Sequence, residues 1–153
     1  MIAVAVIGVI AMIGLPGLKA MLENNRVATQ TNRLVSAIHL ARSEAVKRNK
    51  AVTLCPVGDG GGLCGDDWSK GWKVVIEGEN RVLRVFDVKD QLLSVPSAPA
   101  RLVFNAEGRV DATASAQREI IIRKASFQRR VALTLGGSVR SCRVKQDGAC
   151  VER

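Results

Sequence analysis

The chain has 153 residues, 23 basic and 14 acidic, and a formal net charge of +9 at pH 7. Its length fits one domain, and 47% hydrophobic with 24% charged residues is typical of a folded protein and excludes a disordered tail. Aromatic residues make up only 3% and tyrosine is absent, which argues against a single-stranded nucleic-acid binder that stacks bases on aromatic rings.

The first 18 residues, MIAVAVIGVIAMIGLPGL, carry no charge. As a helix they would be about 27 Å long, close to the hydrocarbon thickness of a bilayer. A cleaved signal peptide, the competing interpretation, would show a basic residue before the apolar run and small residues at a cleavage site after it, and the sequence has neither. We therefore expect residues 1–22 to form a hydrophobic transmembrane or filament helix segment, bent at Pro16.

The helix is predicted to continue as an amphipathic segment over residues 23–50, because residues 20–49 contain neither proline nor glycine. Apolar or small residues recur at steps of three and four, which predicts one stripe that packs on the domain that follows. The stripe consists of Val27, Thr31, Leu34, Val35, Ile38, Ala41 and Ala45. His39, the one histidine, lies at the edge of this stripe and is interpreted as a surface residue.

From Ala51 onward the pattern changes to short runs with a period of two, which predicts β-strands. The expected strands cover residues 51–55, 71–77, 81–87, 101–105, 108–112, 119–123, 130–135 and 138–144. Residues 92–100, with two prolines, are predicted to form a loop. The expected fold class is α+β, with a long N-terminal helix packed on an antiparallel β domain over residues 51–153.

Four cysteines form two local groups, Cys55 with Cys64 and Cys142 with Cys150, each separated by turn-forming residues. Three disulfide pairings are possible, and we favour the local one. Zinc is the less favoured alternative, because its sites usually place two cysteines two to four residues apart. Disulfides would place the β domain in an oxidising compartment such as the periplasm.

Catalysis is a weak hypothesis for this chain. A single histidine could serve as a base, and no pattern marks a nucleophile. We therefore expect a protein that is not an enzyme, with no cofactor and with no catalytic, cofactor-binding or metal-binding residues.

Five stretches of the sequence resemble the GspH/FimT class of minor pilins and pseudopilins, a type IV pilin-like family. They are the apolar helix with Gly8 and Pro16, NNRVATQTNRLVSAIHLARSEAVKRNKAVTLCP (24–56), DWSKGWKVV (67–75) and FNAEGRV (104–110), followed by the C-terminal strand with Cys142. The combination of LARSEAVKR and TLCP at that spacing is the most specific part. The resemblance covers essentially the whole chain and implies a long helix packed on β-sheets.

The resemblance also implies where such a protein resides and what it contacts. Members of the family insert in the bacterial inner membrane by a single helix, with the β domain in the periplasm, and assemble with other pilins or pseudopilins through their N-terminal helices. They are made with a basic leader followed by Phe-Thr-Leu-Ile-Glu-Leu, so we expect codons for such a segment upstream of Met1. The expected function is a structural subunit that helps to initiate or cap a type IV pilus or a type II secretion pseudopilus.

The alternative function is DNA binding for uptake in natural transformation. DNA-binding members of the family carry a C-terminal Gly-Arg-x-Arg element, and here the matching residues 137–140 read Gly-Ser-Val-Arg, so serine replaces the first arginine. The candidate residues for double-stranded DNA are Arg140, Arg143, Lys145, Arg129 and Arg130. An ordinary basic edge that discourages strand addition explains the same residues equally well.

Overall fold

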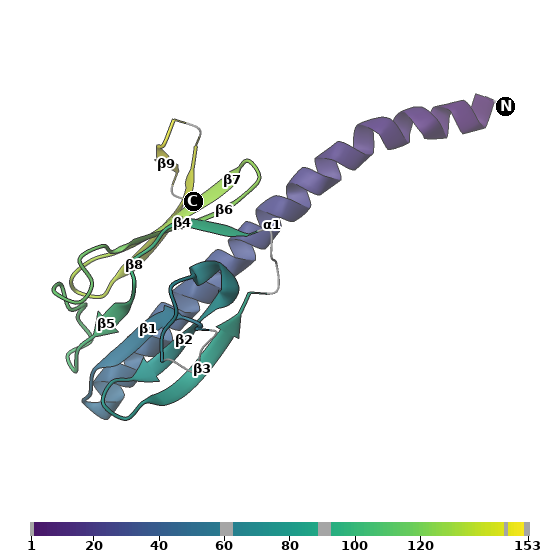
Figure 1. The fold of residues 1–153 in the computed structure, drawn as a ribbon. Coiled ribbons are helices and arrows are strands. Elements are labelled where there is room, and N and C mark those ends of the chain that lie inside the picture. The colour runs from purple at the N-terminus through teal and green to yellow at the C-terminus, as the bar shows by residue number, and fades with distance from the viewer. Residues whose placement is uncertain (1, 59–62, 89–92, 146, 152–153) are drawn as a thin grey trace.

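The computed structural model describes residues 2–58, 63–88, 93–145 and 147–151, with side chains described from Gly17 onward. A single helix, α1 (Ile2–Arg48), forms the N-terminal part. Figure 1 shows that its C-terminal half lies against the β-strands and that its N-terminal part curves away from them. Asn49, with a φ of 52°, ends the helix in the left-handed conformation that such terminal residues commonly adopt.

The β domain consists of two antiparallel sheets. The first has the strand order β3-β2-β1-β5 and the second the order β4-β6-β7-β8-β9. The first-sheet strands are β1 (Val52–Pro56), β2 (Gly71–Ile76), β3 (Arg81–Asp87) and β5 (Leu102–Phe104). The second-sheet strands are β4 (Ser94–Ser97), β6 (Glu119–Lys124), β7 (Phe127–Leu133), β8 (Val139–Val144) and β9 (Cys150–Val151), and a short 3-10 helix, η1 (Trp68–Lys70), precedes β2.

The core lies between α1 and both sheets. The predicted stripe is confirmed: six of its seven residues are fully buried, and Val35 is partly buried against the core. Apolar side chains from both sheets complete the core, among them Leu54, Trp72, Phe104, Ile120, Ile122 and Val131. His39 is exposed, as expected for a surface residue. The fold class predicted from the sequence is thus confirmed.

Backbone hydrogen bonds between loops join the two sheets along α1. The Val110 amide donates to the Leu135 carbonyl at 3.0 Å, and the Asp111 amide donates to the Val103 carbonyl at 2.9 Å. The segment between β5 and β6 therefore ties the residues after β7 to the first sheet, and both sheets lie against α1 (Figure 1).

Two predictions about strands were wrong. Residues 108–112 form no strand, and Val110 makes only an isolated bridge with Phe104. The reason is that the turn at Gly108 directs the chain toward the second sheet. The loop predicted over 92–100 contains β4, an edge strand in which Pro96 is tolerated because the ladder skips from Ser94 to Ser97. Residue 92 lies outside the described residues.

Among the residues that the structure describes, no helix is long and apolar enough to span a membrane. The uncharged run of residues 1–18 lies mostly outside the described side chains, of which only Gly17 and Leu18 belong to it.

Candidate functional site

The structure joins Cys55 to Cys64 and Cys142 to Cys150 in disulfides, with Cα–Cα distances of 5.6 and 5.4 Å. The first disulfide holds the loop after β1 against that strand, and the Gly65 amide reinforces it by donating to the Pro56 carbonyl at 2.9 Å. The second holds β9 beside β8 at an exposed edge of the second sheet. Both disulfides therefore brace chain reversals.

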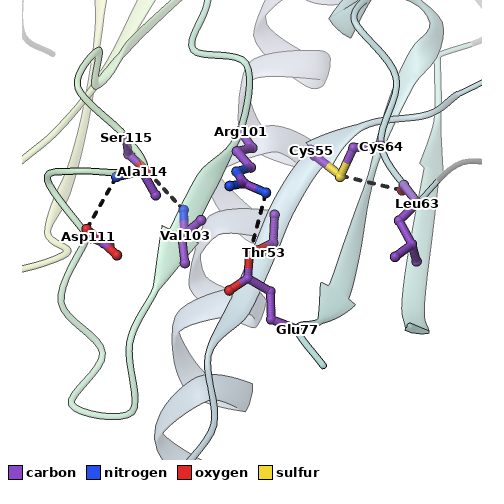
Figure 2. A network of polar contacts seen from close by, with 10 residues as sticks. All are labelled: Thr53, Cys55, Leu63, Cys64, Glu77, Arg101, Val103, Asp111, Ala114 and Ser115. Atoms are coloured by element: carbon purple, nitrogen blue, oxygen red, sulfur yellow. Dashed lines mark hydrogen bonds and ion pairs between the residues drawn. A yellow bond between two sulfur atoms is a disulfide. The ribbon is translucent and has the colours of Figure 1, made fainter. Parts of the chain in front are cut away.

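A group of polar contacts lies on the face of the first sheet that points away from α1 (Figure 2). The Thr53 hydroxyl donates to a Glu77 carboxylate oxygen at 3.0 Å, and the Arg101 guanidinium lies 3.8 Å from the same oxygen. On the adjoining loop the Ser115 hydroxyl accepts from the Val103 amide at 3.0 Å. The contacts of Glu77 therefore link β1 to the residues that follow β2 and precede β5, and the separate Ser115–Val103 bond holds the next loop to β5.

Asp111, in the same view, organises its own turn (Figure 2). Its carboxylate accepts hydrogen bonds from the Thr113 hydroxyl at 2.6 Å, the Thr113 amide at 2.9 Å and the Ala114 amide at 3.3 Å. These donors favour the ionised form and hold the pKa of Asp111 below its ordinary value. The interaction shapes a turn and leaves the carboxylate solvated.

The five candidate cations do not form one cluster, because the pairing of β7 with β8 divides them between two faces. Arg129 pairs with Arg143, and Ile122 of β6 also lies opposite Arg129. Ile122 is buried in the core, so Arg129 and Arg143 are on the face that packs toward α1. Arg130 pairs with Cys142 on the opposite face, which we call the outer face. Arg140 shares the outer face because it lies opposite Ala132, two residues from Arg130.

A hollow of about 450 Å³ lies where Arg129, Arg143 and Lys145, which we call the helix-facing cations, approach α1. Its lining includes Asn24 of α1, Phe127, Arg129, Arg143, Lys145 and Asp147. We call it the Asn24 hollow. The structure thus brings three of the five candidates together, and they face one carboxylate.

Arg123 of β6 lies on the outer face with Arg130 and Arg140, and no motif in the sequence marked it. Arg123 pairs with Gln128 and so shares the face of Arg130. Its guanidinium donates to the Gln128 side chain at 2.9 and 3.1 Å, and the Arg130 Nε lies 3.8 Å from a Glu119 carboxylate oxygen. This row of arginines crosses three neighbouring strands.

Arg42, within LARSEAVKR, has a structural role that the sequence pattern did not predict. Its guanidinium reaches the turn between β7 and β8, where Gly137 has a φ of 77°. Arg42 follows Ala41, a residue of the predicted stripe. This neighbouring position is the sequence signal that Arg42 lies at the rim of the helix face that packs on the β domain. Glu44, in the same motif, forms an ion pair with Arg48 at 2.5 Å.

Apolar side chains of α1 are exposed just before the helix reaches the sheets. Leu18, Met21 and Leu22 expose 55%, 62% and 49% of their surface, whereas Val27 is fully buried. Among the α1 side chains that the structure describes, Val27 is the first that the β domain buries fully. This leaves an apolar helical surface that a partner or a lipid could cover.

Comparisons with known proteins agree with this geometry. The family model described as type II transport protein GspH matches residues 30–137. Two crystal structures of the type IV minor pilin FimU from Pseudomonas aeruginosa are similar to the chain. One has a TM-score of 0.62 and 22% identity and covers 78% of this chain and 90% of FimU. The other has a TM-score of 0.58 and 21% identity and covers 74% and 90%. No curated protein matches the sequence significantly.

Proposed function

The chain belongs to the GspH family of type II transport proteins, and on this premise we propose that it is a minor subunit that helps to initiate or cap a type IV pilus or a type II secretion pseudopilus. The observation that carries this proposal is the division of α1 into a part buried by the β domain and a part that projects from it (Figure 1). The projecting part exposes Leu18, Met21 and Leu22, and burying such side chains against neighbouring helices favours assembly.

We further propose that residues 1–18 hold the protein in the inner membrane before assembly, with the β domain in the periplasm. The support is the uncharged composition of this run and the two disulfides, which persist in an oxidising compartment. Fractionation tests this part: the full chain should remain with membranes until detergent is added. Release of the chain by mild lysis without detergent would contradict it.

Assembly is tested by replacing Met21 and Leu22 with aspartate. Both side chains are exposed, so the variant should fold, but the new charges should keep it out of sheared filaments. The matched control replaces Val82 and Val85 of β3, which expose 43% and 46%, with aspartate. If the Met21 and Leu22 variant entered filaments while the Val82 and Val85 control did not, assembly through α1 would be refuted.

Deletion of the gene distinguishes the two machines. Loss of surface pili with normal secretion would assign the subunit to a type IV pilus. Loss of secretion with normal pili would assign it to a pseudopilus. Complementation by the full chain is the control for both measurements.

DNA binding for uptake is the second candidate function, and the arginine row of the outer face is the observation that favours it. Arg123, Arg130 and Arg140 project from three adjacent strands on one side of the second sheet. Arg140 is the residue that matches the last position of the family's Gly-Arg-x-Arg element. Such a row would contact duplex phosphates without reading base sequence.

A further inference from the structure

We propose that the Asn24 hollow is a membrane-docking surface, at which Arg143 and Lys145 bind the phosphate groups of anionic phospholipids and hold the β domain against the bilayer. This inference rests on the proposed anchoring of residues 1–18 in the membrane. It assigns the helix-facing cations a partner different from that of the outer-face arginines.

The height of the hollow along α1 fits the headgroup layer. Asn24, which lines the hollow, is six residues beyond Leu18, the last residue of the uncharged run. At 1.5 Å per residue this places the hollow about 9 Å beyond the end of that run. The headgroup region on each side of a bilayer is roughly 5–8 Å thick, so the turns after β6 and β8 lie at its outer boundary.

The charge of the hollow fits an anionic surface. Arg129, Arg143 and Lys145 line it together with one carboxylate, that of Asp147. Arg143 and Lys145 are exposed, and neither side chain makes a hydrogen bond or ion pair with another residue that the structure describes. Each such cation near an anionic bilayer strengthens binding measurably, and salt screens the attraction.

Exposed apolar groups beside the hollow favour a lipid over a nucleic acid. Met21 is three residues before Asn24 and therefore lies on the same side of α1, with 62% of its surface exposed. Phe127, partly buried, contributes an aromatic ring to the lining. A headgroup layer accommodates cations and apolar side chains together, whereas duplex phosphates would cover only the cations.

The test uses the full chain reconstituted in nanodiscs of phosphatidylcholine, with or without phosphatidylglycerol. Hydrogen exchange is followed in peptides that contain Ser126 and Asp147, at the two turns beside the hollow. Exchange in these peptides should be about fivefold slower in the anionic discs and should recover at high salt. The Arg143→Gln/Lys145→Gln variant should lose this protection. The control Lys47→Gln/Arg81→Gln removes the same charge at the C-terminal end of α1 and the start of β3, and should retain it.

The outcomes separate this inference from the function on which it rests. Equal exchange in both kinds of disc, with the chain firmly embedded, would overturn the docking surface and leave the anchor intact. Failure of the chain to enter either disc would overturn the anchor and the docking surface together. Protection of the same peptides by double-stranded DNA, with no effect of phosphatidylglycerol, would overturn lipid docking in favour of nucleic acid.

Discussion

The Arg42 guanidinium on α1 donates a hydrogen bond to the Gly137 carbonyl oxygen, 3.3 Å away and 95 residues further along the chain. A side chain at position 137 would meet the Gly108 carbonyl oxygen and the Nε and Cδ atoms of Arg42. Arg42 also passes close to Gly108, in the turn after β5. One side chain of LARSEAVKR therefore holds a turn from each side of the β domain against the helix.

Replacing Arg42 with alanine should lower the free energy of unfolding by about 1–2 kcal/mol, because a partly buried, charge-assisted hydrogen bond and the packing of its aliphatic stem are lost. Urea unfolding of the full chain in a mild detergent measures this. Lys47→Ala, at an exposed site on the same helix, is the control and should stay within about 0.5 kcal/mol of the parent. Equal stability of the Arg42 variant and the control would show that the turn is held by other contacts.

Three glycine substitutions separate backbone strain from steric contact. Gly136→Ala should be neutral within about 0.5 kcal/mol, because its nearest neighbour would be the Thr134 hydroxyl at 3.8 Å. Gly148→Ala, at a φ of 81° with open space around it, should cost about 1 kcal/mol. Gly137→Ala combines a φ of 77° with the contact to Gly108 and should cost more than about 2 kcal/mol. The order of the three midpoints in the same urea titration is the measurement, and any other order contradicts the steric argument.

The Asp111 carboxyl should titrate below the ordinary range of an aspartate, mainly because of the Thr113 hydroxyl. Its contribution to stability is complete above the ordinary aspartate pKa and is lost as the pH falls through the lowered pKa. Thr113→Val should raise the pKa of Asp111, as followed by carboxyl carbon NMR. Asp67, whose pKa is lowered by Ser69, is the internal control and should be unchanged in that variant.

Removing either disulfide should destabilise the chain by roughly 2.5–3 kcal/mol in the chain-entropy model, since the cysteines are 9 and 8 residues apart. The Cys55→Ala/Cys64→Ala variant should lose more than Cys142→Ala/Cys150→Ala, because Cys55 is fully buried and Cys150 is exposed. Guanidinium unfolding compares the two. Non-reducing peptide mapping of the parent checks the pairing, and a peptide joining Cys55 to Cys142 would refute it.

Periodicity predicted the helix and most strands because the buried residues of each element follow the local spacing that is typical of that element. The stripe from Val27 to Ala45 repeats at helical spacing, and β2 is a continuous buried run. β4 was missed because its two serines and a proline give no apolar alternation, and it exists only through pairing with β6. β9, two residues long, likewise depends on its pairing with β8.

The candidate site was only partly predictable. Residues 140 and 143 differ by an odd number of positions and therefore point to opposite faces of a strand, and the structure places Arg140 and Arg143 on opposite faces of the second sheet. The alternation of side chains along a strand does not show which face of the second sheet meets α1. That face is identified by Ile122, which is buried and lies opposite Arg129. Asn24 and Lys145 line one hollow although they are far apart in the chain, and this long-range arrangement leaves no local pattern in either segment.

If the outer face binds double-stranded DNA, the salt dependence of binding will identify it. Arg123, Arg130 and Arg140 touching phosphates would give a log–log slope near −2.7, because each phosphate contact contributes about −0.9. Arg130→Gln/Arg140→Gln should then flatten the slope by about 1.8 and weaken binding equally for all sequences. Arg143→Gln/Lys145→Gln, on the helix-facing side, is the matched control of equal charge and should leave the slope unchanged. Fluorescence anisotropy with a labelled duplex and the full chain in detergent provides the measurement. If instead only the Arg143 and Lys145 variant flattens the slope, DNA lies at the Asn24 hollow. If the chain shows no binding at low salt, the arginine row serves only as a charged sheet surface.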